Sequence, residues 1–495
     1  ADMLSDKAVD VLATMAPSGW LKNVKLQLPR QPSAAKSSEN RPENSSPAFR
    51  LQANVENAAL SAWRGAPGAS GVSGYLEMTP ARGLVELESK NMTLAFPGVY
   101  EQPMDFDTVI GQVGWDILPD RVLVDSSPLY LTADHGPATA LLDLDIPLVK
   151  TADNRPEMTL TVGLKDTDAK YRSKFIPSTL SRNFLDWMSV SVPSGHVVDG
   201  GFIFRGSLNK GDSEHRTVQL YLNVDDTHLA YHPDWPILTA IEGLVEVSDL
   251  VVEVSADKAK MYELDVAATA VRVAPLKEGG LWLTVDTAAK GSATDALRVV
   301  NDSVISQMVG NVFQRWQLAG EAAATVTLGI PLAGAVAQTD IDVAVELSGA
   351  ALKIPEYRLA FDHINGPVSY NSIEGIRSPN LKAHFYQKPV VVNVLQKADK
   401  ATQIDMNGRI DMRDVQAWSG QPALDFTEGE TDFEATINIR PNTISDLSIR
   451  SHLVGVAIDL PAPYGKAKKQ PRDFWLRLPI AAGNPLLSMG MSTDI

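Results

Sequence analysis

Short runs in which apolar and polar residues alternate recur along almost the whole chain of 495 residues. In the run 218–224 (VQLYLNV), valine and leucine occupy one phase, and glutamine, tyrosine and asparagine occupy the other. Successive side chains of a strand point to opposite faces of a sheet, so such a run predicts a strand with one apolar face. The same alternation returns at 158–164, 341–347 and 454–460. The pattern predicts an all-β protein with a long antiparallel sheet, and the functional question is what covers its apolar face.

Composition narrows the classes of function that such a sheet can serve. The chain carries 44 Lys and Arg against 60 Asp and Glu, a net charge of −16, which argues against nucleic acid as a partner. It has no cysteine, so disulfides, thiolate metal sites and cysteine nucleophiles are excluded. A hydrophobic content of 44% and a charged content of 21% are typical of a folded protein.

The chain shows few breaks in this strand pattern. The Ser/Pro/Asn-rich segment 31–47 predicts a flexible loop. Apolar residues at helical spacing predict two short amphipathic helices, at 178–189 and 295–316. The second helix is expected to pack over one edge of the sheet or to act as a lid.

Faint internal repeats indicate a stacked array. Three segments share a tryptophan (Trp63, Trp235 and Trp418), a proline within the next four residues (Pro67, Pro236 and Pro422), and, seven residues after the proline, a glycine that opens a strand-like run. The spacing predicts an array of stacked repeats, with approximate units 1–165, 166–347 and 348–495. If the sheet forms the open groove considered below, we expect one continuous β-groove rod over 1–495. We expect the tryptophans to plug the turns where repeats begin.

The residue patterns of catalytic and metal sites are mostly absent. The eight histidines show no His-x-x-x-His or His-Glu-x-x-His spacing, and we expect them to be scattered surface or turn residues. Acid pairs such as Asp143/Asp145 and Asp340/Asp342 lie opposite apolar neighbours, as solvated strand residues do. The basic run from Lys466 to Arg472 is interpreted as a solvated loop. We therefore predict no catalytic residues, no metal, no cofactor and no enzymatic activity.

Two coverings of the apolar face remain open from pattern alone. In a β-sandwich, each apolar face packs on a second sheet about 10 Å away. In an open groove, the sheet bends into a trough whose inner face stays available to lipid tails. The predicted groove lining is the inward phase of the cleanest strands: Val218, Leu220, Leu222, Val224, Leu281, Leu283, Val285, Val326, Leu328, Ile341, Val343, Val345, Val454, Val456 and Ile458. Two further classes of protein fit such strands: an adhesive array of sandwiches, and a carbohydrate-binding β-solenoid, which should expose a row of aromatic residues.

Several segments are similar to a known family. The stretch 175–243, with YHPDWP at 231–236, and the segment DLPAPYGK at 459–466 closely resemble the central region of the YhdP family, a branch of the AsmA-like superfamily that includes TamB. Further likeness lies in the segments that begin at Met15 and Ser292, so the resemblance covers most of the chain.

The resemblance implies a long, twisted, U-shaped antiparallel β-sheet groove of the AsmA-like type, also called a β-taco. It implies non-enzymatic transport of phospholipid between the inner and outer membranes, across the periplasm of a Gram-negative bacterium. A full-length member is anchored in the inner membrane by an N-terminal helix, and we expect this chain to be a central fragment without it. The expected partners are phospholipid and, through parts outside this chain, the two membranes. The expected state is monomeric.

Overall fold

The structure is a computed structural model that divides into two compact units. It describes residues 13–28, 49–63, 65–149, 154–303, 305–306, 312–332, 338–355, 358–397, 401–439, 445–480 and 488–492. Unit 1 comprises Ala1–Leu229 with Ala240–Val254, and unit 2 comprises Ala230–Thr239 with Ser255–Ile495. The predicted loop at 31–47 lies outside the described residues, and the three predicted repeats stay a prediction.

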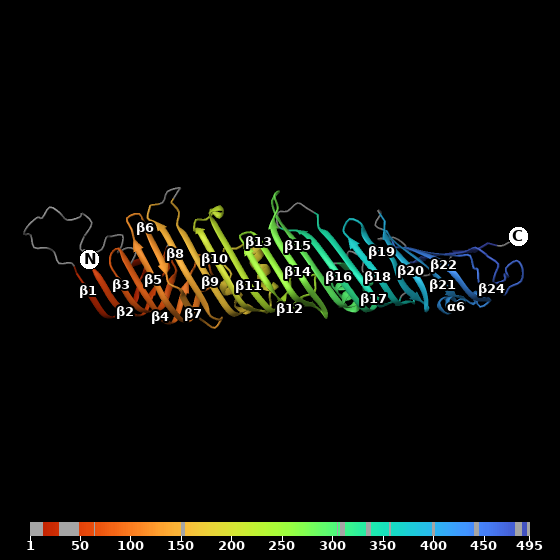
Figure 1. Cartoon of the computed structure of the whole chain (residues 1–495), viewed down its shortest axis with the longest axis horizontal. Helices are drawn as coiled ribbons and strands as arrows, with labels where there is room; N and C mark the ends of the chain where they lie inside the picture. Colours follow the sequence, from red (N-terminus) through yellow and green to blue (C-terminus); the bar gives the residue numbers. More distant parts are fainter. Residues whose placement is uncertain are drawn as a thin grey trace, which may run out of the picture. The chain divides into compact units, whose positions relative to one another are not determined.

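Unit 1 is a ladder of antiparallel strands that pair largely in chain order (Figure 1). The short strands β6 and β7 share the place between β5 and β8. The strands are β1 (Ser18–Gln27), β2 (Arg50–Leu60), β3 (Gly68–Met78), β4 (Arg82–Ala95), β5 (Met104–Ile117), β6 (Arg121–Ser126), β7 (Leu129–Thr132), β8 (Ala138–Pro147), β9 (Glu157–Asp168), β10 (His196–Ser207) and β11 (Arg216–Leu229). Strands β12 (Leu238–Ser248) and β13 (Val251–Met261) include two of the three points where the chain passes from one unit to the other, and the third point directly follows β11.

Unit 2 repeats this plan. Its strands are β14 (Leu264–Pro275), β15 (Leu281–Ser292), β16 (Gln317–Pro331), β17 (Asp340–Ile354), β18 (Leu359–Asn371), β19 (Gly375–Phe385), β20 (Lys388–Gln396), β21 (Thr402–Asp411), β22 (Thr427–Ile439), β23 (Ser445–Ser451), β24 (Val456–Ile458), β25 (Phe474–Ile480) and β26 (Ser488–Met491). They also pair antiparallel, with β24 on β22 and β25 on β23. The predicted all-β antiparallel fold is confirmed.

Short helices interrupt the strands. The helix predicted at 178–189 is present as α3 (Arg182–Ser191), and it begins after Ser181, whose hydroxyl accepts a hydrogen bond from the Phe184 N–H. The helix predicted at 295–316 is shorter. It forms α4 (Ala293–Asn301), which packs on β15 and β16, and the chain later makes the 3₁₀ turn η3 (Val312–Arg315). Residues 304 and 307–311 lie outside the described residues.

The sequence pattern did not reveal the other helical segments. These are α2 (Arg172–Phe175), α6 (Met412–Ser419) and the 3₁₀ turns η1 (Ala169–Tyr171), η2 (Ser213–His215) and η5 (Pro422–Leu424). Most are too short to show an apolar period. Over the described residues, no helix has the length and apolar character needed to cross a membrane.

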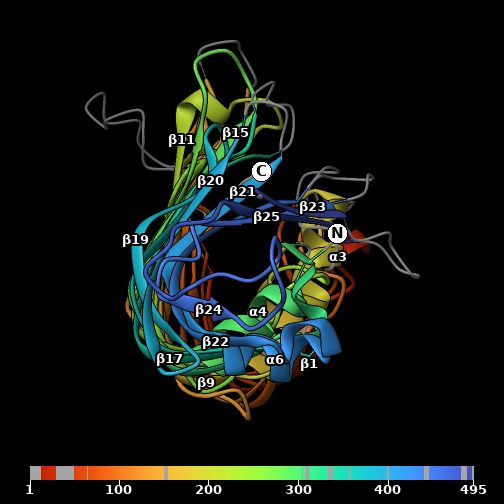
Figure 2. The same ribbon diagram turned by 90° about the vertical axis from the view of Figure 1, so that its right-hand side faces the viewer.

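β-Bulges bend the strands within each unit. In unit 1, Asn57 and Asn91 adopt φ angles of +48° and +52° inside strands β2 and β4. In unit 2, Ala268, His363 and Asn380 adopt φ angles near +50° where the pairing register slips. An extra residue in one strand bends it and increases its twist. Figure 2 shows the result for unit 2, where β17, β19 and β22 curve around instead of running flat.

Several of the most buried residues lie at these bends. In unit 2 they are Ala350, which is completely inaccessible, and Ile364, both at register slips. The same cluster continues along the sheet through Ala383, Phe385, Val390, Phe433 and Ala435. In unit 1 a second cluster forms around Met92, Phe106 and Val109, beside the Asn91 bulge. This distribution identifies the apolar face as the concave face of each bend.

The bend in unit 2 generates a stability prediction. Gly320 lies at the register slip of β16 with φ +102°, and a Cβ added there would lie 2.6 Å from the Cα of buried Ala350. Gly279 has a similar φ of +95° but no atom within 4 Å of an added Cβ. Both alanine variants strain the backbone, and only Gly320→Ala also overpacks the bend. We expect Gly320→Ala to lower the free energy of unfolding by about 1–3 kcal/mol more than Gly279→Ala, measured by urea denaturation. Equal effects of the two variants would contradict the proposed close packing.

Candidate functional site: the apolar face

The apolar side chains of neighbouring strands are aligned across the ladder. In unit 1, strand pairing places Ala140, Val162, Phe202 and Leu220 side by side on β8, β9, β10 and β11. A second row runs parallel to the first, through Leu142, Leu160, Phe204 and Val218. Register alone produces these rows, because residues paired across a sheet share one face. Each row runs perpendicular to the strands.

Unit 2 carries rows of the same kind. One row passes through Val271, Val285, Leu328 and Ile341 on β14 to β17. Two further rows follow the pairing on β16 to β19 and on β20 to β25: Val326, Val343, Tyr370 and Ile376, and then Val392, Met406, Ala435, Ile449 and Leu476. The apolar phase therefore continues from strand to strand across the unit.

Apart from buried Ala435, the residues of these rows are only half-buried. On β11, Val218, Leu220 and Leu222 keep intermediate exposure while the residues between them are exposed, and Ile341 and Val343 on β17 show the same alternation. The inner face of a sandwich has a second sheet packed on it, and its side chains are then as buried as a domain core. Here rows such as those on β11 and β17 keep accessible apolar surface, unlike the inner face of a sandwich.

Most of the predicted lining residues occupy this half-buried phase. They are Val218, Leu220, Leu222, Val224, Leu281, Leu283, Val285, Val326, Leu328, Ile341, Val343 and Val345. Their contact with lipid stays a prediction. Strand pairing brings those of β15, β16 and β17 together, with Val285 opposite Leu328 and Val326 opposite Val343.

The prediction for the strand at 454–460 does not hold. Only Val456–Ile458 forms a strand, and Val454 lies in the turn before it with 51% of its surface exposed. Val456 is completely buried and Ile458 nearly so, and both pack with Met412 and Leu453 in a closed cluster beneath α6. Alternation placed Val454 and Val456 in one phase, but it could not show that the strand begins only at Val456 or that α6 packs against this segment.

Sequence reasoning missed half-buried apolar residues on later strands. Val368, Val392, Ile404 and Met406 lie in the same half-buried phase as the predicted set. The run 389–395 (PVVVNVL) places apolar residues on both faces, so its alternation is hidden. The signal that identifies these residues is the pairing partner of each strand, which a single sequence does not show.

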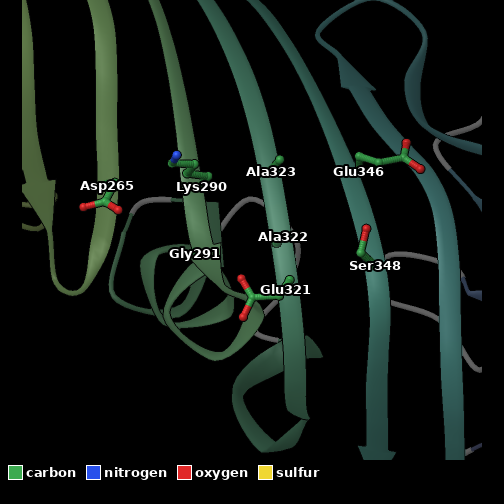
Figure 3. A pocket seen from close by; sticks show the side chains of 8 residues that line it. All are labelled: Asp265, Lys290, Gly291, Glu321, Ala322, Ala323, Glu346 and Ser348. Atoms are coloured by element: carbon green, nitrogen blue, oxygen red, sulfur yellow. The ribbon is translucent and has the colours of Figure 1, made fainter.

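Charged side chains lie on the opposite face. A surface hollow of about 280 Å³ is lined by Asp265, Lys290, Glu321 and Glu346, together with small residues. Figure 3 shows these side chains on successive strands from β14 to β17. Lys290 pairs in register with Ala323, in the phase opposite to Val285 and Leu328. The hollow therefore belongs to the polar face, and with three acids to one lysine it does not suit an apolar tail.

The basic run near the end of the chain is not simply a solvated loop. Lys466 and Arg472 are buried, and the Lys466 ammonium donates to the carbonyls of Leu453, Val456 and Ala467. Arg472 donates to the carbonyls of Tyr464 and Gly465. Burial lowers the pKa of Lys466, and the nearby Arg472 charge adds to this effect. These two cations hold the loop together, whereas Lys468, paired with Glu428, and Lys469 are exposed and fit the expectation.

Two histidines also depart from the expected surface positions. His135 is buried among the rings of Phe106, Tyr171 and Phe175, and burial lowers its pKa. His196 joins three strands, since its Nε2 lies 2.8 Å from Asp166 Oδ1 and its Nδ1 lies 2.7 Å from Asp225 Oδ1. The hydrogen bonds to Asp166 and then Asp225 raise the pKa of His196.

The His196 bridge predicts a pH-dependent contribution to stability. A group whose pKa is raised by folding stabilises the folded state fully below its unfolded pKa, near 6.5, and loses this contribution as the pH rises through the folded value. We therefore expect His196→Asn to speed hydrogen exchange in β9–β11 at pH 6, and the difference from wild type to shrink as the pH rises. His215→Asn, at an exposed position whose carboxylate contact is 4.0 Å long, should change little at either pH. A difference that grew with pH would contradict the bridge.

Comparison with known proteins places this geometry in a family. The family model described as "YhdP protein" matches residues 1–493. The chain is also 20% identical over 485 residues to the Escherichia coli (strain K12) protein named "Intermembrane phospholipid transporter YhdP". That match covers 95% of this chain and 36% of the relative, so the chain spans about a third of the relative's length. No solved structure matches. Because the family model extends over nearly its whole length, this chain belongs to the YhdP family.

Proposed function

We propose that this chain forms part of a phospholipid conduit, in which acyl chains lie on the half-buried apolar rows while the headgroups remain in water. The observation that carries the proposal is the continuity of these rows across the strands of each unit. A further support is the name of the E. coli relative, an intermembrane phospholipid transporter. The proposal involves no covalent chemistry.

The energetics favour a surface of this kind. Moving a diacyl lipid out of a bilayer exposes about 30 methylene groups, at roughly 0.8 kcal/mol each, or about 24 kcal/mol in total. A lipid that crosses water unaided must overcome a barrier of this order. An apolar row offers the tails a substitute for the bilayer interior, and neighbouring strands about 4.8 Å apart give closely spaced positions along the path.

The placement of charge supports the same use. A charge on the apolar phase would be costly to cover with hydrocarbon, because a buried charge without a partner loses its hydration. Asp286, Asp342 and Glu346 all lie in the exposed phase of their strands, next to the lining residues. Tails can therefore move from strand to strand without covering a charged group on these rows.

The cellular setting is part of the proposal. We place the chain in the periplasm of a Gram-negative bacterium, between the inner and outer membranes, and the full-length protein in the inner membrane through an N-terminal helix. The organism and name of the relative support this placement. We further propose that the chain acts as a monomer and that other parts of the full-length protein contact the membranes.

A charge placed on the apolar phase should block lipid binding. We expect Val343→Lys in unit 2 and Leu222→Asp in unit 1 to reduce the phospholipid that copurifies with the chain by about tenfold, because acyl chains would have to cover an unpaired charge. A tenfold loss corresponds to about 1.4 kcal/mol of binding free energy. The measurement is lipid extraction of the purified protein followed by mass spectrometry. Restoration of lipid transport in cells that lack the full-length protein gives a second readout.

Neighbouring positions on the opposite face provide matched controls. Ala344→Lys adds the same charge as Val343→Lys one residue along the strand, and Gln219→Asp adds the same charge as Leu222→Asp three residues away. Both control positions lie in the exposed phase. These variants should retain lipid at the wild-type level. Equal lipid content in both sets, with all variants folded by circular dichroism, would reject the conduit. A sandwich array or a carbohydrate-binding protein would carry no phospholipid in any variant.

A further inference from the structure

Two histidines and an aspartate come together on strands β18 and β19. Potential ligand atoms of Asp362, His363 and His384 all lie within 4.8 Å of one another. The Oδ1 atom of Asp362 is 2.8 Å from Nδ1 of His363 and 3.6 Å from Nδ1 of His384. The two imidazole rings lie face to face in a tilted arrangement, with centroids 4.8 Å apart.

A β-bulge creates this cluster. Residues that follow each other in a strand normally point to opposite faces, so Asp362 and His363 would be separated. His363 instead adopts φ +50° at a register slip between β18 and β19. Asp362 pairs with His384, while Phe361 and Phe385 pair and stack in the core on the other face. The bulge therefore presents two consecutive polar side chains on the outer face, beside His384.

The donor set fits one class of ion. Two imidazoles and a carboxylate suit Zn²⁺ and similar divalent transition ions better than Ca²⁺ or Mg²⁺, which prefer oxygen ligands. Zinc binds histidine nitrogen at about 2.0–2.1 Å, so two ligand atoms on a tetrahedral ion lie roughly 3.3 Å apart. The separations of 2.8 and 3.6 Å from Asp362 bracket this value. Small side-chain rotations would bring the three ligands onto one ion, and water could supply the fourth position.

The surroundings of the cluster allow access from solvent. The side chains of His363, Asp362 and His384 are 71%, 52% and 40% exposed. A shallow hollow beside the rings is lined by Asn365, Lys382, Pro389 and Val391. Lys382 is a positively charged residue near the cluster, two residues from His384 in the same phase. Its side chain is exposed and long enough to place the ammonium group in water, away from a bound ion.

We propose that Asp362, His363 and His384 form a binding site for a divalent transition ion of the zinc type, on the outer face of the bend in unit 2. The bound ion would tie β18 to β19 on the side opposite the Phe361–Phe385 stack. This site is separate from the apolar rows, so it does not depend on the proposed lipid function.

The test is zinc binding to the purified chain without an affinity tag. Titration calorimetry with ZnCl₂ should detect one equivalent bound by the wild type, and Zn²⁺ should raise its melting temperature. Cobalt(II) should give the visible absorption of a low-coordinate site. His384→Ala should weaken binding by more than about 100-fold, beyond the roughly 10–100-fold that is typical for loss of a residue outside the ligand shell. His363→Asn should do the same, and asparagine tolerates the positive φ at this position.

His452→Ala is the matched control. His452 is also an exposed histidine beside an aspartate, with its Nδ1 2.5 Å from Asp473 Oδ1, but it belongs to no three-ligand group among the described residues. This variant should bind zinc like the wild type, and all three variants should retain phospholipid. The site is rejected if the wild type binds no zinc, if His384→Ala binds it equally well, or if His452→Ala loses it.

Discussion

The structure depends on one constraint: along strands such as β11, β16 and β17, the apolar phase keeps intermediate exposure instead of the full burial of a sandwich interior. Close packing is found elsewhere, for example around Ala350 at the register slip of β17 and β18. Away from the bends, the same apolar phase continues along each strand at intermediate exposure. Strand register aligns these side chains into rows, so the surface that remains accessible is continuous across each unit.

Alternation was enough to predict most of the strands and the phase that is less exposed. Val218, Leu220, Ile341 and Val343 lie in that phase, because a period of two survives in any strand with one polar face. Where both phases are apolar, as at 389–395, the signal disappears. The helix predicted at 295–316 was too long because apolar spacing does not reveal where the helix ends, and α4 ends at Asn301.

Other features depend on contacts between residues that are distant in the sequence. The bulge at His363 has no glycine to mark it, and it brings Asp362 and His363 beside His384 only after β18 and β19 pair. Val456 was expected to line a groove, yet it is buried because residues of α6 pack against it. Lys466 was expected in solvent, yet it is buried because backbone carbonyls of the loop accept hydrogen bonds from its ammonium group. A single sequence carries no record of such partners.

The central claim is that the half-buried phase of each strand meets lipid. The most direct test places a photoreactive amino acid at each position from 324 to 328 in turn, and identifies the adducts after illumination in cells. Ala324, Val326 and Leu328 lie in the half-buried phase, and Thr325 and Thr327 are exposed. We predict phospholipid adducts at 324, 326 and 328 and none at 325 and 327. Adducts without this two-residue period, or no lipid adducts at any position, would contradict the claim.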